Sequence, residues 1–578
     1  MSGFVKKRGM LLFYILIAVV TAAFIAKVFL CDDVLSFVDE SSMFATAYRF
    51  YQGDAILVDE WSAPQLFGVV LLPLFSIFRF FSHSNDGLFL FMRLNYIGLK
   101  LSVLIYGIRK AEHMRLKRFN VYAGLLLWYI FSTMCVETLT YQTVPPALLM
   151  FVLIGAIADN TTKAEYFLMG MAYALSVLSQ VFFVFSYPVL LIILFVYHKK
   201  TGRSNRSAIF FHLGILTVFL WFLYLLFSRA SMHDIIVNLP YVLSEPDHDV
   251  SEMSFFSLIF SNGIRRFGAV MIRDSSTIVL FVNILLLFII SVAFIAKWKR
   301  REMLKTLIPI SLLISMLAMA LETFEKGDPT MNMMFAPFIW ASVEVMFFVR
   351  DRRYPAYWIM SYMYVAGVAL GTNTGGIATS GALILVAIVF FFFWPGTEAD
   401  HREGNIPEVR RINEIIKALS CAAFPAAVTC AVFLTLFFKF YLNSQSRPHE
   451  PYSSFTNRIT VGPMKGLYTT DGLYEIYMDI WDDVESIEKT EDDLLFCGNA
   501  INMAFLDAEV RYGTMGTMFF YLDFDRAKDY WRLHPDRIPT IIYCNDFADD
   551  DVNRLMSILR AEDYDIRRED MKLIAIRK

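Results

Sequence analysis

Charged residues are scarce in this chain, and the usual signs of a nucleic-acid-binding protein or a zinc protein are missing. Only 19% of its 578 residues are charged, whereas about 25% is typical of soluble proteins. Its 52 basic and 55 acidic residues give a net charge of −3, so it lacks the strongly basic character of nucleic-acid-binding domains. Its six cysteines show no zinc-binding spacing. The chain also contains no internal repeat or low-complexity segment.

Apolar residues, in contrast, are abundant. They make up 57% of the chain, and the mean hydropathy is +0.50, which is more apolar surface than a soluble protein exposes. A helix of about 20 apolar residues can cross a bilayer, and about thirteen stretches qualify, so the sequence predicts a polytopic α-helical membrane protein. The candidate spans are 10–30, 88–108, 119–136, 144–157, 166–178, 181–197, 208–227, 277–296, 307–321, 331–349, 356–370, 377–394 and 419–441.

The first span is expected to remain in the membrane, with the N-terminus in the cytoplasm. Basic residues precede it, as in a signal peptide, but it is long and lacks a small-residue cleavage site. Basic residues of short loops collect on the cytoplasmic side, and here all the basic clusters can lie inside together. This orientation places the C-terminus outside. The clusters lie within residues 6–8, 109–118, 199–206, 297–305, 350–353 and 402–417.

The apolar run 66–81 is a special case. If it crossed the membrane, the basic cluster at 109–118 and every later cluster would lie outside. The run also contains Pro73 and follows Pro64. We therefore expect an interfacial or re-entrant helix that stays on the outer side of the membrane.

An acidic segment lies between the first span and this run, in a predicted external loop of residues 31–87. Carboxylates beside a bilayer are costly to desolvate, so they must face water or a polar substrate. The segment is therefore the best candidate for an active site, although its first two acids are expected to be helix caps. Its acidic residues are Asp32, Asp33, Asp39, Glu40, Asp54, Asp59 and Glu60.

The composition changes at residue 443, which divides the chain into a transmembrane part (1–442) and a water-soluble domain (443–578). Strand-like and helical stretches alternate in the second part, which predicts an extracytoplasmic α/β domain. Cys497 and Cys544 end two of these strands and either form a disulfide or remain buried thiols. The predicted strands are 458–461, 494–497, 518–522, 540–543 and 572–576, and the predicted helices are 472–487 and 551–561.

The N-terminal part also resembles a known family. A retained first helix is followed by Asp39-Glu40, by Gly53-Asp54, by a proline-containing interfacial helix and by Arg93-Leu94 at the head of the next span. In layout and short motifs, chiefly over residues 10–118, this is similar to the polytopic glycosyltransferases of the GT-C superfamily. These enzymes take a sugar from a polyprenyl-phosphate carrier and transfer it on the outer face of the membrane.

The resemblance implies roles for individual residues. Asp39 would act as the base or orient the acceptor, with Glu40 as its partner. The family's second external acid falls on Glu137, or is lost at Gln142. The resemblance also implies a bacterial plasma membrane, and we expect no cofactor.

Sugar transfer from a lipid phosphate requires two kinds of side chain. A carboxylate must accept the proton of the acceptor hydroxyl, for which Asp59 and Glu60 are further candidates, and cations must neutralise the departing phosphate. Arginine binds phosphate through two hydrogen bonds, and four arginines are predicted near the outer face. Pairing with local acids such as Asp274, or with lipid headgroups, is the alternative role for these arginines. The four are Arg93, Arg265, Arg266 and Arg273.

Other ionisable residues are given structural roles. Lys100 and Glu344 lie inside predicted spans, where an ionisable residue suggests function, but a structural pair or a snorkelling side chain is favoured. His233, Asp247, His248 and Asp249 have side chains that bind metals, yet histidines in a long polar loop are usually solvated. We therefore predict no metal site.

The sequence thus predicts a cell-envelope glycosyltransferase that uses a polyprenyl-phosphate-linked sugar and a glycan, lipid or protein acceptor. A transporter or flippase of lipid-linked saccharides is an alternative, although the chain shows no clear half-repeats with broken helices. An outer-face polysaccharide polymerase or ligase, and a non-enzymatic scaffold for the C-terminal domain, also remain open. In the glycosyltransferase interpretation the C-terminal domain is an accessory or acceptor-binding module.

Overall fold

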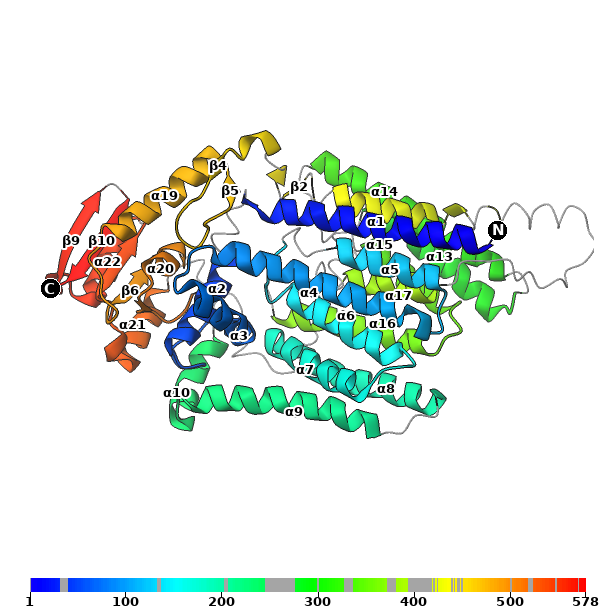
Figure 1. Ribbon diagram of the computed structural model, residues 1–578, viewed down its shortest axis with the longest axis horizontal. Coiled ribbons are helices and arrows are strands. Elements are labelled where there is room, and N and C mark those ends of the chain that lie inside the picture. The colour runs from blue at the N-terminus through cyan, green and yellow to red at the C-terminus, as the bar shows by residue number, and fades with distance from the viewer. Residues whose placement is uncertain are drawn as a thin grey trace, which may run out of the picture.

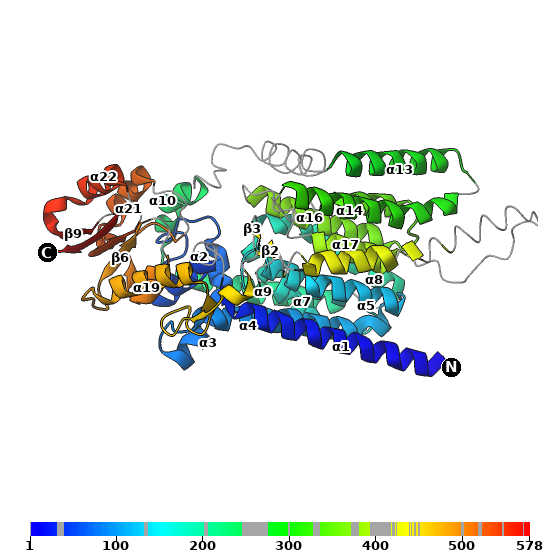
Figure 2. The same cartoon turned by 90° about the horizontal axis from the view of Figure 1, so that it is seen from above.

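The computed structural model is mostly helical and has two parts (Figure 1). Long helices lie side by side in a bundle at one end, and an α/β domain formed by the C-terminal residues lies at the other end (Figures 1 and 2). The described residues are 2–578 except 32–39, 132–136, 202–205, 245–275, 299–300, 327–335, 372–380, 393–417, 419–421, 424, 438–439, 441, 444–446, 449–450, 499–501, 518–522, 546–547 and 570.

Every predicted span coincides with a helix in the described part of the chain. Six helices there are long and apolar enough to cross a membrane, and four more are apolar but shorter. These helices support a membrane protein, while about thirteen crossings stays a prediction. The helices before the C-terminal domain include α1 (Ser2–Val28), α2 (Ser41–Gln52), α3 (Gln65–Ser82), α4 (Leu88–Lys110), α5 (Arg118–Ile130), α6 (Val144–Ile157), α7 (Lys163–Ser179), α8 (Tyr187–Thr201), α9 (Arg206–Phe227), α10 (Met232–Leu243), α13 (Thr277–Ile295), α14 (Leu307–Lys326), α15 (Ala336–Met346), α16 (Arg353–Gly371) and α17 (Gly381–Phe391).

Two glycines allow α7 and α9 to touch through their backbones. A Cβ atom at Gly170 of α7 would collide with the carbonyl oxygen of Phe211 in α9, and one at Gly214 would collide with that of Phe167. Small residues permit this kind of close approach between membrane helices. Any larger residue at either position would push the two helices apart.

The C-terminal domain is a three-layer α/β/α sandwich. Its sheet has the strand order β7-β6-β8-β10-β9, in which β6 runs parallel to β7 and β8, and β10 runs antiparallel to β8 and β9. Helices α19 and α20 cover one face, and α21 and α22 cover the other. The elements are α19 (Asp471–Glu485), β6 (Leu494–Cys497), α20 (Asn502–Ala508), β7 (Arg511–Tyr512), α21 (Phe524–Leu533), β8 (Ile541–Cys544), α22 (Asp549–Leu559), β9 (Tyr564–Glu569) and β10 (Lys572–Arg577).

The predicted helices and most predicted strands of this domain are confirmed. Strands β6, β8 and β10 and helices α19 and α22 lie within about two residues of their predicted bounds. The predicted strand 458–461 begins in β4 (Asn457–Arg458), which belongs to a separate small sheet. The predicted strand 518–522 lies outside the described residues.

The two cysteines of the sheet are free thiols. Cys497 and Cys544 are both buried, so the structure corresponds to the second of the two alternatives that the sequence allowed. Burial raises the pKa of the Cys544 thiol to about 12, which keeps it in the unreactive protonated form at neutral pH.

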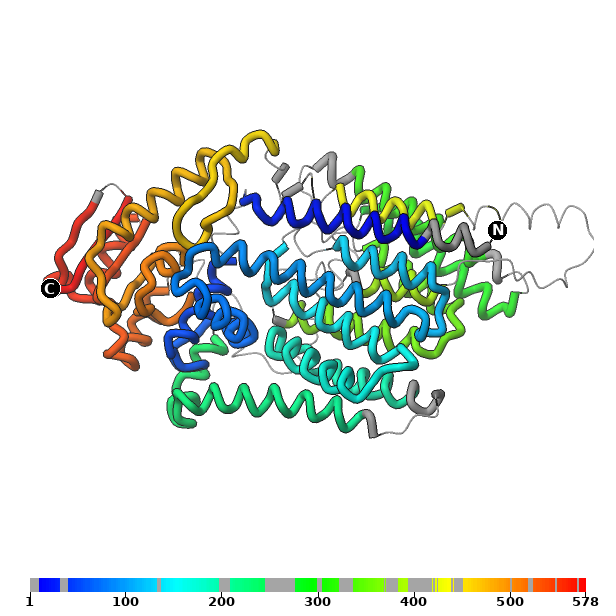
Figure 3. The backbone as a smooth tube through the Cα atoms, in the orientation of Figure 1, coloured from blue at the N-terminus to red at the C-terminus, as the bar shows by residue number. Residues whose placement is uncertain are grey.

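The acidic loop packs against the C-terminal domain rather than standing apart from it (Figure 3). Strand β1 (Leu30–Cys31), which follows α1, pairs in parallel with β5 (Tyr468–Thr469). Helices α2 and α3 share a hydrophobic core with α19 and α20, and Trp61 belongs to the core on the opposite face of the sheet. We call the region where residues 40–87 contact the C-terminal domain the junction. The composition boundary at residue 443 is therefore not a boundary in packing.

The chain contacts the C-terminal domain both before α3 and near the end of this helix. Before its start, the backbone N–H of Trp61 donates to the carbonyl oxygen of Met515 at 2.6 Å. Near its end, Arg79 pairs with Glu509 at 2.9 Å. The helix is long and apolar enough to span a membrane, but a spanning helix would bring only one of its ends near a domain on one side. That this helix does not cross the membrane stays a prediction.

Candidate functional site

The structure describes only part of the predicted site. The acidic residues that it describes are buried at the junction or beside it, and they are Glu40, Asp54, Asp59 and Glu60. The predicted site residues and caps that lie outside the described residues are Asp32, Asp33, Asp39, Arg265, Arg266 and Arg273.

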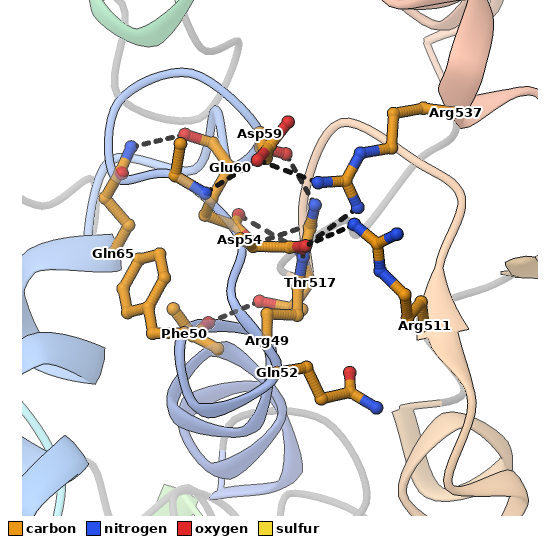
Figure 4. Close-up of polar contacts among 12 residues, drawn as sticks. Arg49, Phe50, Gln52, Asp54, Asp59, Glu60, Gln65, Arg511, Thr517 and Arg537 are labelled. Atoms are coloured by element: carbon orange, nitrogen blue, oxygen red, sulfur yellow. Dashed lines mark hydrogen bonds and ion pairs between the residues drawn. The ribbon is translucent and has the colours of Figure 1, made fainter. Parts of the chain in front are cut away.

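Arg49 of α2 contacts three of the described acids, Asp54, Asp59 and Glu60 (Figure 4). Its Nε atom is 2.7 Å from Asp54 Oδ2, and its Nη1 atom is 2.8 Å from Glu60 Oε2. Its Nη2 atom donates to the carbonyl oxygen of Asp59 at 2.5 Å. The side chain is fully buried, and a buried charge without a partner costs several kcal/mol. The arginine and the acids therefore stabilise each other.

Arg537 adds a second guanidinium to this network from the C-terminal domain (Figure 4). It lies 2.7 Å from Asp54 Oδ1 and 2.9 Å from Asp59 Oδ2. Arg511 of β7 approaches Asp54 at 3.9 Å. The acids of the loop thus bind arginines from two distant parts of the chain and connect α2 to the C-terminal domain.

The Gly53-Asp54 motif forms a turn that reverses the chain at the end of α2. Gly53 ends α2 with a φ of 111°, in the left-handed region that favours glycine. The next backbone N–H, that of Asp54, donates to the carbonyl oxygen of Arg49 at 3.0 Å. The turn therefore brings the Asp54 carboxylate into contact with Arg49, five residues before it in the sequence.

Burial raises the pKa of every carboxyl group in this network, and the neighbouring arginines lower it. At Asp54 burial is outweighed by Arg49 and Arg537, which lower its pKa below the ordinary value. Burial and then the neighbouring Asp54 raise the pKa of Asp59, although Arg537 opposes them. Burial also raises the pKa of Glu60 in spite of Arg49. The arginines thus favour the ionised form of Asp54, whereas burial favours the protonated forms of Asp59 and Glu60.

Glu40 and Arg93 form a second buried ion pair. The Nε and Nη2 atoms of Arg93 lie 2.9 and 2.6 Å from the two carboxylate oxygens of Glu40, in the bidentate geometry typical of strong pairs. Arg93 also donates to the carbonyl oxygen of Leu30 at 3.0 Å. The pair therefore connects the chain after α1 with the starts of α2 and α4. Two residues predicted for different roles, one catalytic and one for phosphate, are partners here.

A third charge pair lies further along the same face of α4. Lys100 follows Arg93 by two helical turns and approaches Glu137 at 3.8 Å, and both side chains are buried. The Nζ atom of Lys100 also donates to the carbonyl oxygen of Phe131 at 2.5 Å. The structural pair favoured for Lys100 is present, and its partner is the predicted second acid.

Hydroxyl and amide groups lie beside the acids at the junction. The Nδ2 atom of Asn502 donates to the Ser42 hydroxyl at 2.7 Å and to the carbonyl oxygen of Thr517 at 2.6 Å. The backbone N–H of Thr517 in turn donates to Glu60 at 3.2 Å. Carboxylates, guanidinium groups and hydroxyls are the groups that bind sugars and phosphates.

The sequence analysis identified the acids but not Arg49 and Arg537, the arginines that bind them. Arg49 could have been found, because it precedes Gly53-Asp54 within one helical turn and a half. Arg537 has no local signal, since almost 500 residues separate it from its partners. In the part of the chain that the structure describes, no group of three or more His, Cys, Asp or Glu side chains is placed to hold a metal ion.

The chain was also compared with known proteins. No protein-family model, no curated protein and no solved structure matches it.

Proposed function

We propose that this protein is a membrane glycosyltransferase that moves a sugar from a polyprenyl-phosphate carrier to a glycan, lipid or protein acceptor on the outer face of the membrane. The observation that supports this most is the Glu40–Arg93 pair, which connects the chain after α1 with the starts of α2 and α4. A donor anchored in the bilayer and an acceptor in water can meet at such a place. The resemblance to GT-C enzymes supports the same reaction.

We assign the role of base to Asp39. It directly precedes Glu40 in the sequence, and Glu40 is bound by Arg93. A base must reach the acceptor hydroxyl to take its proton. Asp59 and Glu60 are buried and bound by arginines, so they are better suited to hold the acidic loop in place.

The experiment that tests the function is a transfer assay. Purified full-length protein in lipid nanodiscs is mixed with a radiolabelled sugar on undecaprenyl or dolichyl phosphate and with an envelope extract that supplies acceptors. Label is expected to leave the lipid carrier and appear in the acceptor fraction. If no carrier-linked sugar is consumed in any combination, the enzyme proposal fails and the transporter alternative is preferred.

Arg265 and Arg266 are proposed to bind the carrier phosphate, because their predicted loop is external although basic residues usually lie inside. Arg93 is already engaged by Glu40, which leaves these loop arginines as the stronger candidates. A charge-assisted contact contributes about 1.5 to 3 kcal/mol, so replacing both residues with glutamine is expected to weaken donor binding roughly tenfold or more per contact. Donor binding is measured by native mass spectrometry or calorimetry.

The matched control for this variant is Arg115→Gln with Arg118→Gln, which removes the same charge from a loop predicted to be cytoplasmic. It is expected to leave donor affinity unchanged. If the Arg265 and Arg266 variant also binds the donor like wild type, these arginines serve lipid headgroups or Asp274, and the phosphate site lies elsewhere.

The outer placement of α3 is tested by cysteine labelling. A cysteine at Ser84, just after this helix, is expected to react with a membrane-impermeant maleimide in intact cells, because the chain contacts the predicted external C-terminal domain both before α3 and near its end. A cysteine at the exposed Lys117, in the predicted cytoplasmic cluster, is expected to react only after permeabilisation. The reverse pattern would mean that α3 crosses the membrane and that the predicted orientation is wrong.

One observation favours the transporter or flippase alternative. Ionisable groups inside the bundle, namely the Lys100–Glu137 pair and Glu344, are typical of pathways for polar substrates. Reconstitution into liposomes that contain a fluorescent lipid-linked saccharide distinguishes the two functions. Flipping without sugar transfer would support the transporter.

A further inference from the structure

Glu344 is an isolated acid in the interior of the bundle. It lies in α15, is 0% exposed and is surrounded by the largest hydrophobic core. Among the residues that the structure describes, neither of its carboxyl oxygens has a hydrogen-bond partner. Buried polar atoms are rarely left in this state, so this carboxyl group needs a chemical explanation.

The helices packed against α15 contain few charged residues. They are α13, α14, α16 and α17, of which α13 and α17 contain no charged residue. Helix α16 brings Arg353, which is bound to Asp351 at 2.6 Å. The other titratable residues on these helices are Glu322, Glu325 and Lys326 at the end of α14 and Tyr354, Tyr357, Tyr362 and Tyr364 on α16.

Glu344 also points away from the polar contacts of its own helix. The Ser342 hydroxyl accepts a hydrogen bond from Trp358 at 3.0 Å, and the Ser342 carbonyl oxygen accepts one from Tyr354 at 2.6 Å, which joins α15 to α16. A residue two positions further on lies on nearly the opposite side of a helix. Glu344 shares its side instead with Trp340, one turn earlier, whose indole N–H likewise has no partner among the described residues.

An ionised carboxylate at this position would cost several kcal/mol, because the described part of the chain places neither a cation nor a donor on it. A neutral carboxylic acid avoids most of this cost. Glu137 provides the contrast within the same chain, since it is also buried but has Lys100 at 3.8 Å. The surroundings of Glu137 therefore favour an ionised carboxylate, whereas those of Glu344 favour a neutral acid.

We propose that Glu344 is a proton-binding site inside the helix bundle, separate from the junction. Its ligand is a proton, which neutralises the carboxylate where no cation of the described residues pairs with it. An ionisable residue at this depth is a functional site by default in a membrane protein. The proposal does not depend on whether the protein transfers or transports a saccharide.

The test uses dicyclohexylcarbodiimide, a lipophilic reagent that modifies protonated carboxyl groups in apolar surroundings. The carboxyl proton passes to a carbodiimide nitrogen and the carboxylate oxygen bonds to the central carbon. The adduct then rearranges to a stable N-acylurea without losing a group. In full-length protein in membranes, mass spectrometry is expected to find this adduct on Glu344 and not on Glu137. Its yield should decrease as the pH is raised.

Two variants complete the test. Glu344→Gln is expected to abolish the adduct and to keep the unfolding temperature of wild type, because an amide replaces a neutral acid of the same shape. Glu137→Gln should leave the adduct on Glu344 unchanged. The infrared spectrum of wild type should also contain a protonated-carboxyl band that Glu344→Gln removes. Absence of the adduct from Glu344 in wild type, together with an unchanged infrared band in the variant, would show an ionised group and overturn the proposal.

Discussion

Replacing Asp39 with asparagine is expected to slow sugar transfer about 10² to 10⁴-fold, which corresponds to about 3 to 5 kcal/mol of activation free energy. Asparagine keeps the size of the side chain and most of its hydrogen bonding, so the protein should still fold and insert. It removes the negative charge and the basicity, so the acceptor hydroxyl loses the group that takes its proton. The rate is measured with purified protein and a polyprenyl-phosphate-linked sugar.

Asp32→Asn is the matched control for this variant. It makes the same chemical change seven residues earlier in the same segment, at a position predicted to be a helix cap, and turnover should remain close to wild type. Donor binding should be similar in all three proteins. Full activity of the Asp39 variant would reject Asp39 as the base and return attention to Asp59, Glu60 and Glu137.

The largest effect on stability is expected from Arg49→Met. This change leaves Asp54 and Glu60 buried without the guanidinium that lies 2.7 and 2.8 Å from them. Removing one partner of a buried ion pair typically costs about 3 to 5 kcal/mol. The free energy of unfolding of the purified protein in detergent should fall by about this amount, as measured by denaturant titration.

Arg532→Met is the control for the stability prediction. Arg532 pairs with Asp529 at 2.8 Å, but its side chain is 64% exposed, and exposed pairs contribute about 0 to 1 kcal/mol. Combining Arg49→Met with Glu60→Gln should recover part of the lost stability, because one uncompensated charge is removed. Equal stability of the Arg49 and Arg532 variants would show that the network does not hold the loop.

The helices could be predicted because their signal is local. A run of about 20 apolar residues identifies a membrane helix whatever surrounds it. Strands β6 and β8 were predicted for a similar reason, since Leu494–Cys497 and Ile541–Cys544 are short apolar runs flanked by polar residues. Strand β9 was missed because four of its six residues, YDIRRE, are charged. It lies at the edge of the sheet, where charged residues prevent further pairing.

The candidate site could be predicted only in part. The sequence singled out Glu40, Arg93 and Glu137, and the structure places all three in buried ion pairs. It did not show that Glu40 and Arg93 bind each other, or that Lys100 is the partner of Glu137. A charge can be read from the sequence, but its partner depends on which helices pack together.

The sequence by itself determined the apolar helices, the acidic loop and the change to an α/β domain near residue 443, because hydrophobicity and composition belong to each segment alone. Only the tertiary structure decided that the loop and the C-terminal domain share a core and that Arg49 and Arg537 neutralise its acids. It alone also left Glu344 without a partner among the described residues. The physical reason is that the energy of a buried charge depends on the groups within a few ångströms of it, and these come from segments hundreds of residues apart.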